Sequence, residues 1–349
     1  MDSTALSPNV TSMLLSASLS PVTRSRASRL HSVSSRGVIA NGHSMNLNAD
    51  GESTWASLGV ASVDDPRASY AFHVFGDVSS DVLAIVIPGL GDTVGSLHWA
   101  SRDGALAKRA RVARFDARSS GGRHGERALE SDVEDLTLAI DWLRKEVSET
   151  KVTIVGHSTG CQIACAFLAS ASGREASERF GIERVVLQAG VSDRDWYDHA
   201  FGKETMEEAI ARARAIPGEA LMPVETPGMY GVPTTARRFL SLARAGGDDD
   251  WFSLDLFDES TKSLEGKNKS NKIARLTTCA DVDVRLVVST RDEYVPYDSV
   301  TVRAHNERVR AEFEAVAKSA KVLYVDANHD LSDASDADID RVVDFILAR

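Results

Sequence analysis

Short runs of β-branched and aliphatic residues recur along this chain, and stretches with helical spacing separate them. The middle runs are apolar throughout, which is typical of parallel strands buried on both faces of a sheet. Strands that alternate with amphipathic helices predict βαβ units in a doubly wound, mostly parallel α/β sheet. We expect strands at 69–75, 82–87, 112–116, 152–155, 184–188, 284–289 and 321–325, and helices at 105–110, 129–147, 161–170, 302–318 and 338–347.

One long segment interrupts this alternation. Residues 191–283 hold helical patterns at 204–216 and 235–245, several prolines and no convincing strand. An insertion of this size usually covers the carboxyl edge of such a sheet, where open α/β folds bind ligands. We therefore expect an α/β domain at 66–349, with this segment forming a helical cap inserted after the sixth core strand.

Composition narrows the possible partners. The chain has 349 residues and a net charge of −11, and it has no long Lys/Arg run, which argues against nucleic acid and anionic membranes. No apolar run approaches the ~20 residues of a membrane span. Three cysteines are too few for a disulfide framework and favour a reducing compartment. We expect a small-molecule substrate, with no organic cofactor and no metal, and the sequence leaves protein partners open.

Residues 1–65 differ from the rest of the chain. The first 50 hold twelve serines, four arginines, no lysine and two acids. Ser-rich, Arg-bearing and acid-poor composition is typical of organelle transit peptides, and the serine content favours the chloroplast over the mitochondrion. The alternative is a disordered tail without a targeting role, as in a cytosolic protein. We expect 1–65 to be disordered and to lie outside the folded domain.

A serine framed by glycines follows the expected strand at 152–155 and opens the next helix. In Gly156-His157-Ser158-Thr159-Gly160 the two glycines let the helix pack closely on the strand, while the serine hydroxyl stands clear of a sharp turn. The backbone N–H of Thr159 would then supply half of an oxyanion hole. This context predicts that Ser158 is a nucleophile; the alternative is a helix-capping serine.

A nucleophilic serine needs an orienting acid and a base, and in this kind of fold they follow the serine in that order. Asp292 comes just past the expected strand 284–289, and His329 follows the expected strand 321–325. A neutral imidazole with a pKa near ~6.5 can accept the Ser158 proton. We therefore predict the set Ser158, Asp292 and His329.

Other residues could fill two of these roles. Glu293 is adjacent to Asp292, and Asp193 follows the strand at 184–188, a position that some enzymes of this architecture use for the acid. For the base, the rivals of His329 lie inside helical or cap segments or directly beside the nucleophile: His305, His199 and His157.

The loop after the strand at 82–87 should complete the oxyanion hole. It reads Pro88-Gly-Leu-Gly-Asp, and the backbone N–H of Leu90 is the first choice, with Gly91 the second. A dinucleotide-binding loop is excluded because Val94 stands where the third glycine of that motif is needed.

Acidic residues gather in the expected cap. They lack the ordered spacing of a calcium-binding EF-hand loop, so a solvated loop with Asp or Ser helix caps is favoured. Carboxylates that rim a cleft would disfavour polyanionic substrates such as acyl-CoA. The acids are Asp248, Asp249, Asp250, Asp255, Asp258 and Glu259.

Five segments resemble an uncharacterised α/β-hydrolase family of plants, fungi and protists, catalogued as a domain of unknown function. They are GHSTGCQ (156–162), LQAGVSDRD (187–195), GGDDDWFSLDLFDE (246–259), DEYVP (292–296) and ANHDLS (327–332). The resemblance runs from about residue 80 to the C-terminus. It implies an α/β-hydrolase fold with Ser158, Asp292 and His329 as the triad. The loop at 119–126 lacks the aromatics associated with this region of the family, so the family's substrate contacts are not carried over.

These observations favour a serine hydrolase that acts on a carboxylic ester or thioester through an acyl-enzyme. A descendant of this fold that only binds a ligand, or a C–C hydrolase, lyase or perhydrolase with the same triad, remains open, because fold and triad do not distinguish them.

Overall fold

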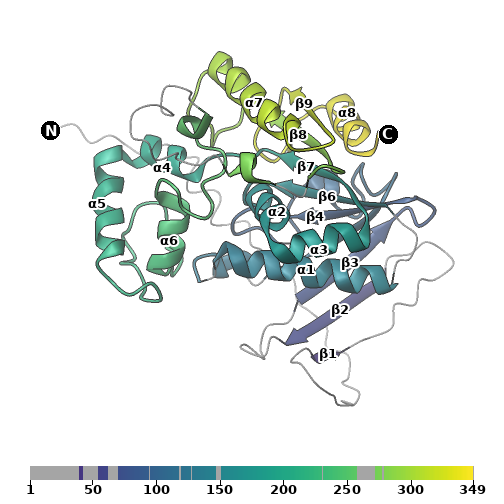
Figure 1. The fold of residues 1–349 in the computed structure, drawn as a ribbon, viewed down its shortest axis with the longest axis horizontal. Coiled ribbons are helices and arrows are strands. Elements are labelled where there is room, and N and C mark those ends of the chain that lie inside the picture. Colours follow the sequence, from purple (N-terminus) through teal and green to yellow (C-terminus); the bar gives the residue numbers. More distant parts are fainter. Residues whose placement is uncertain are drawn as a thin grey trace. The chain divides into compact units, whose positions relative to one another are not determined.

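In the computed structural model the described residues are 39–41, 54–61, 70–93, 95–117, 119–126, 128–146, 151–229, 231–257, 272–276 and 279–348. Their strands are β1 (Ile39–Asn41), β2 (Thr54–Ala61), β3 (Tyr70–Gly76), β4 (Val82–Ile87), β5 (Arg111–Phe115), β6 (Lys151–His157), β7 (Ile182–Gln188), β8 (Asp283–Ser289) and β9 (Ser319–Val325). Together they form one nine-stranded sheet in the order β1-β2-β3-β5-β4-β6-β7-β8-β9 (Figure 1). The pairs β1–β2, β2–β3 and β3–β5 are antiparallel, and the others are parallel. The doubly wound, mostly parallel sheet is confirmed.

The sheet begins earlier than the sequence predicts. β1 and β2 lie within the range 1–65 that was expected to be disordered, and β2 pairs with β3 from Thr54↔Val74 to Leu58↔Tyr70. The prediction is corrected over these strands: sheet pairing joins backbone groups, so a Ser-rich composition nearby does not prevent it. The transit peptide expected within 1–65 is not tested by these strands and stays a prediction; residues 1–38 lie outside the described residues.

Alternate residues of each strand point to opposite faces of the sheet and build two cores. The helices on the two faces are α1 (Leu129–Glu146), α2 (Thr159–Ala169), α3 (Ala171–Phe180), α7 (Ser299–Glu314) and α8 (Asp336–Leu347). Leu83, Ile85 and Ile87 pack on one face, against α1, α2, α3 and α7. Ala84 and Val86 pack on the other, against α8 and the segment around 97–110.

Two local predictions are wrong. The helix α3 was not expected; the Ser170 hydroxyl accepts a hydrogen bond from the Gly173 N–H at its start, and Gly181 ends it with φ 64°. Residues 105–110 were expected to be helical, yet they form hydrogen-bonded turns. This segment is too short to gain much from helix cooperativity, so packing of its alanines and Leu106 decides its shape.

The segment between β7 and β8 forms the cap. It follows β7, which occupies the position of the strand expected at 184–188. The cap helices are α4 (Asp193–Phe201), α5 (Lys203–Arg214) and α6 (Ala236–Ala243), and Figure 1 shows them grouped at one side of the sheet, away from α8. Met206, Phe239 and Leu242 belong to an apolar cluster of the cap's own.

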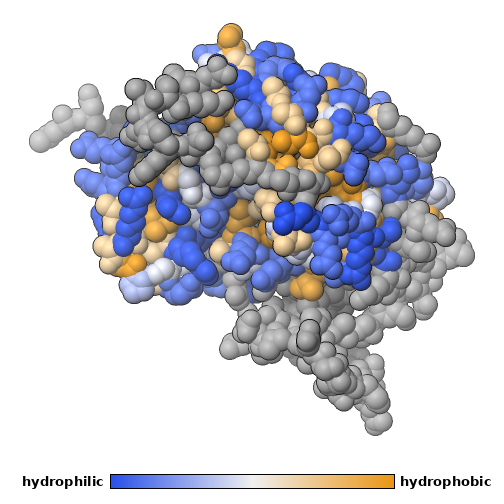
Figure 2. Space-filling model, in the orientation of Figure 1, coloured by the Kyte–Doolittle hydropathy of each residue, from blue (hydrophilic) through white to orange (hydrophobic). Residues whose placement is uncertain are grey.

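Hydrophilic residues cover most of the face seen in Figure 2, with smaller apolar areas between them. Among the described residues, no helix has the length and apolar character needed to cross a membrane.

Candidate active site

Ser158 lies in the turn between β6 and α2. Its backbone angles are φ 52° and ψ −123°, a region that non-glycine residues rarely adopt. Such strain persists only where the surrounding structure enforces it, and it clusters at functional sites. The sharp turn predicted from the sequence is therefore present at the expected serine.

The two glycines of this turn are required for close packing. A Cβ on Gly156 would lie 2.4 Å from the Gly160 carbonyl oxygen, and a Cβ on Gly160 would lie 2.4 Å from the Ile87 carbonyl oxygen. Both obstacles are backbone atoms, so α2 would have to move away from β6 and β4.

Gly156→Ala is therefore expected to lower the free energy of unfolding by at least about 2 kcal/mol, the scale of an overpacked core. Urea denaturation followed by circular dichroism measures this change. Gly122→Ala is the matched control, because a Cβ there meets no atom within 4 Å. An equal effect of the two substitutions would contradict the steric account of the turn.

Asp292 and His329 meet at the carboxyl edge of the sheet. Asp292 follows β8, His329 follows β9, and both are buried. The His329 Nδ1 lies 2.7 Å from the Asp292 Oδ2, and the other oxygen, Oδ1, accepts the Tyr294 N–H at 2.9 Å. Because a carboxylate can only accept, the Nδ1 carries the proton and the Nε2 of a neutral ring keeps a free lone pair.

The surroundings of His329 favour its protonated form. Burial of the ring opposes protonation, but the hydrogen bond to Asp292 and the charges of Asp292, Glu293 and Asp92 outweigh it, so the pKa of His329 is raised above its ordinary value. A raised pKa strengthens the imidazole as a base, and it stabilises the imidazolium that forms once a proton has been accepted.

Gln188, at the end of β7, connects Ser158 to the Asp292–His329 pair. Its backbone oxygen accepts the Ser158 N–H at 3.0 Å, and its side-chain Nε2 donates to the His329 carbonyl oxygen at 2.9 Å. No hydrogen bond joins Ser158 directly to His329 in the part of the chain that the structure describes. Without a substrate, catalytic hydrogen bonds are often long and tighten only in the complex.

The two alternative acids occupy other places. Asp193 is at the start of α4, where its Oδ2 accepts from the Gln162 Nε2 at 3.2 Å; burial and the charge of Asp249 raise the pKa of Asp193 to about 7. Glu293 accepts the backbone N–H of His329 at 3.0 Å. Of the three carboxylates predicted from the sequence, Asp292 is the one placed on the His329 ring.

The loop after β4 lies beside the serine. Asp92 closes it as a turn: its N–H donates to the Gly89 oxygen, and its Oδ2 accepts the Gly89 N–H, both at 3.1 Å. A Cβ on Gly89 would lie 2.9 Å from the Ser158 Cβ, so the Leu90 backbone is adjacent to the nucleophile. Thr159 is the first residue of α2, where backbone N–H groups have no partner within the helix.

Aromatic rings extend from His329 toward the cap. The Tyr294 ring contacts the His329 ring edge-on with centroids 4.7 Å apart, and Trp196 of α4 contacts Tyr294 at 5.4 Å. Trp196 and Leu90 also pack against the apolar cluster of the cap. The sequence does not reveal a role for Tyr294 or Trp196, because that role depends on contacts between distant segments.

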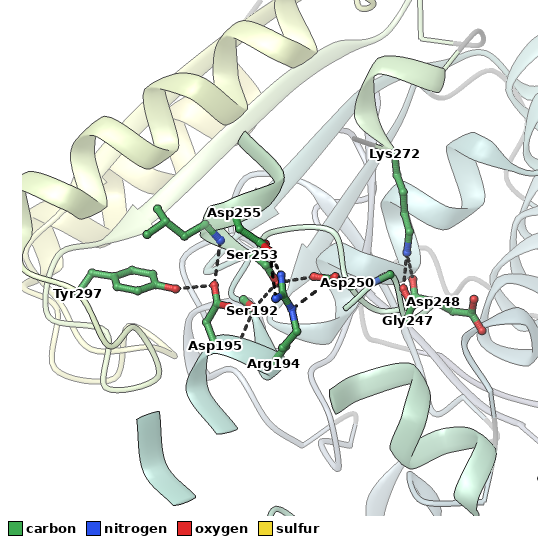
Figure 3. Close-up of polar contacts among 12 residues, drawn as sticks. Ser192, Arg194, Asp195, Gly247, Asp248, Asp250, Ser253, Asp255, Lys272 and Tyr297 are labelled. Atoms are coloured by element: carbon green, nitrogen blue, oxygen red, sulfur yellow. Dashed lines mark hydrogen bonds and ion pairs between the residues drawn. The ribbon is translucent and has the colours of Figure 1, made fainter. Parts of the chain in front are cut away.

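The structure corrects the sequence prediction for the acidic segment of the cap. Asp249 and Asp250 are buried, not solvated, because each meets an arginine. The Arg238 Nη1 donates to the Asp249 Oδ2 at 2.7 Å. The Arg194 Nε lies 3.5 Å from the Asp250 Oδ2, as Figure 3 shows. Arg194 also pairs with Asp255. These ion pairs offset the negative charge that the sequence placed in the cap.

The same contacts hold the N-terminal end of α4 in place. Figure 3 shows Asp195 accepting from the Tyr297 hydroxyl, and Arg194 reaching Ser253 and Asp255. Lys272 donates to the backbone oxygens of the segment at 247–248. The first cap helix is thus attached both to the segment that returns from the cap and to the loop after β8.

All three cysteines are buried thiols, and burial raises the pKa of the Cys161 thiol. Within the described ranges, no three His, Cys, Asp or Glu side chains gather as a metal ion would require.

The sheet, the turn at Ser158 and the inserted cap define an α/β-hydrolase fold. The chain belongs to the family described as "Protein of unknown function (DUF1749)", whose sequence model matches residues 54–348. This match includes β2 and so agrees with the corrected start of the sheet.

Two fungal proteins are similar in sequence. "UPF0613 protein PB24D3.06c" of Schizosaccharomyces pombe is 30% identical over 182 residues, which cover 49% of this chain. "Esterase AN6793" of Emericella nidulans is 25% identical over 233 residues, which cover 52% of this chain. The matches span 55% and 62% of the lengths of these relatives.

Two solved structures share the fold. "Siderophore hydrolase EstB from Aspergillus fumigatus" has a TM-score of 0.54 at 20% identity, covering 80% of this chain and 93% of its own. "Alpha/Beta hydrolase fold protein of unknown function" has a TM-score of 0.56 at 15% identity, covering 84% and 95%. At this identity the likeness concerns the fold alone.

Proposed function

We propose that this protein is a serine hydrolase that cleaves a small carboxylic ester or thioester through an acyl-enzyme. The observation that carries the proposal is the buried hydrogen bond between His329 and Asp292, formed at the same sheet edge as the strained turn at Ser158. A nucleophile, a base and an acid that orients the base are the parts that acyl transfer requires. The esterase name of one fungal relative adds support.

The reaction proceeds in two halves. The Ser158 oxygen attacks the substrate carbonyl while the His329 Nε2 takes its proton, and Asp292 stabilises the imidazolium that results. The N–H groups of Thr159 and Leu90 hold the oxyanion of the tetrahedral intermediate. His329 then protonates the leaving group, and a water activated by the same imidazole releases the acid from Ser158. No cofactor enters this sequence.

The charge around His329 bears on the choice of substrate. Asp92 and Glu293 contribute negative charge there, whereas the acids Asp249 and Asp250 of the cap are paired with arginines. The loops of the sheet edge, more than the cap, should therefore repel polyanions.

Paired butyryl esters of p-nitrophenol and coenzyme A test the reaction and the substrate class together. We expect hydrolysis of both types at low salt, with kcat/KM about tenfold higher for the p-nitrophenyl ester and a difference that shrinks as salt screens the charges. A clear preference for the CoA ester would contradict the charge argument. Failure to hydrolyse either ester, or any of a longer acyl series, would contradict the proposed function.

A further inference from the structure

Gln188 is a fully buried amide that contacts three parts of the site at once. Its backbone oxygen accepts the Ser158 N–H, its side-chain Nε2 donates to the His329 carbonyl oxygen, and its Oε1 contacts the His157 Nδ1. The proposed mechanism gives no role to Gln188 or His157. One side chain therefore connects the turn of the nucleophile, the loop of the base and a second buried imidazole.

The orientation of this amide follows from its partners. A backbone carbonyl can only accept, so the NH₂ group of Gln188 must face the His329 oxygen at 2.9 Å. The amide oxygen then faces His157, and an amide oxygen can only accept as well. The hydrogen bond to Gln188 therefore requires a proton on the His157 Nδ1.

Among the residues that the structure describes, the other nitrogen of His157 has no comparable partner. Its Nε2 lies 3.8 Å from the Asp92 Oδ2, beyond hydrogen-bond distance, and that oxygen already accepts the Gly89 N–H. On the other side the His329 ring lies 4.8 Å away, measured between centroids. A second proton on His157 would place two positive charges side by side each time His329 becomes an imidazolium.

The surroundings of His157 have opposing effects on its pKa. Burial and the neighbouring His329 disfavour the protonated form, whereas Asp92, Gln188 and Asp292 favour it; the balance lowers the pKa of His157 to about 4. His157 is then neutral across the physiological range, in agreement with the single proton that the geometry requires.

We propose that Gln188 is a positioning residue for the hydrolysis: it holds His157 as the neutral Nδ1–H tautomer and fastens the His329 loop to the turn that carries Ser158. This inference rests on the proposed function for its catalytic consequence. The His157 ring then fills the space beside His329 without adding charge, so that only one imidazolium forms during the reaction.

The tautomer is measured directly in the unmodified chain. ¹⁵N-labelled histidine spectra separate the three states of an imidazole ring, and the His157 signals are assigned by their loss in His157→Gln. We expect the Nδ1–H tautomer from pH 5.5 to 8. The Nε2–H tautomer, or an imidazolium near neutral pH, would overturn the proposal.

Gln188→Met keeps the length of the side chain and removes both side-chain hydrogen bonds. We expect kcat for p-nitrophenyl butyrate to fall about 10- to 100-fold with little change in KM, since a small misplacement of the base is costly and Gln188 does not touch substrate. The His157 spectrum should change to a mixture of tautomers. An unchanged kcat together with an unchanged His157 spectrum would overturn the proposal.

Gln188→Glu retains an acceptor for His157 but cannot donate to the His329 oxygen. Its carboxylate should raise the pKa of His157, which a residue that only fills space would not do.

Arg184→Met is the matched control: Arg184 lies on the same strand at the opposite end, where it donates to Asp283 and to the Ile346 oxygen. This control should lower stability and leave kcat and the His157 spectrum unchanged; an effect on kcat equal to that of Gln188→Met would contradict a specific role.

The two proposals fail separately. If the wild-type chain hydrolyses no ester, the proposed function fails, whereas the His157 tautomer can still be measured. If hydrolysis is normal but His157 carries its proton on Nε2, the positioning role fails alone.

Discussion

Replacement of Ser158 by alanine is expected to lower kcat/KM for p-nitrophenyl butyrate at least about 10⁴-fold, because no acyl-enzyme can form without the hydroxyl. The oxyanion-hole N–H groups of Thr159 and Leu90 remain in this variant, so a small rate above the uncatalysed one should persist. Stopped assays at high enzyme concentration measure that residual rate.

The same substitution should leave the fold intact. Alanine experiences the same backbone strain as serine at φ 52°, and the packing glycines at 156 and 160 are unchanged. Thermal unfolding of Ser158→Ala should therefore match that of the wild type. Retention of more than about one hundredth of the wild-type rate in a folded variant would contradict nucleophilic catalysis by Ser158.

The second large effect is expected for Asp292→Asn. An amide can present its NH₂ group to the imidazole and hold the wrong tautomer, so kcat should fall by about 10⁴-fold. Because Asn is close to Asp in size, this loss should occur without gross unfolding.

The pH dependence of this variant has a definite sign. In the wild type, kcat/KM should rise with pH as His329 loses its proton, with a midpoint above ~6.5, because the pKa of His329 is raised. Asp292→Asn removes the carboxylate that raises the pKa of His329 most and leaves the burial that lowers it. The rise of the residual activity should therefore move to lower pH.

Asp193→Asn is the matched control for the acid. Asp193 is partly buried and was an alternative in the sequence, but its carboxylate meets Gln162 rather than His329. We expect this variant to keep most of its kcat and its wild-type pH profile. If Asp193→Asn lost about as much kcat as Asp292→Asn, the assignment of the acid to Asp292 would be wrong.

The sequence was most informative where a local rule determines the result. The turn at Ser158 needs two glycines, a preceding strand and a following helix, all within a few residues. The order of Asp292 and His329, each just past an apolar strand, predicted that they lie at one edge of the sheet because parallel strands share their carboxyl ends. The cap was visible as a break in the alternation of strands and helices.

The sequence was less informative where partners are distant in the chain. Asp249 reads as a surface acid until Arg238 of α6 is seen to pair with it inside the cap. Gln188 reads as the last residue of an apolar strand, and its role appears only once β7 lies beside β6 and the His329 loop is close. Neither pairing leaves a mark in the spacing of residues.

The edge of the sheet was missed for a related reason. β2 is an antiparallel strand that pairs with β3 by backbone hydrogen bonds, and its eight residues follow a Ser-rich stretch. The pattern of a buried parallel strand, on which the other assignments rested, does not describe such a strand.

The most direct test of the central claim is covalent labelling of the full-length chain with a fluorophosphonate, with the adduct located by peptide mass spectrometry. A hydroxyl activated by a neighbouring imidazole reacts with such a probe, whereas an ordinary serine does not. We expect one adduct, on Ser158, that disappears in His329→Ala. A folded wild-type chain without an adduct, or an adduct on another residue, would contradict the assignment of Ser158 as the nucleophile.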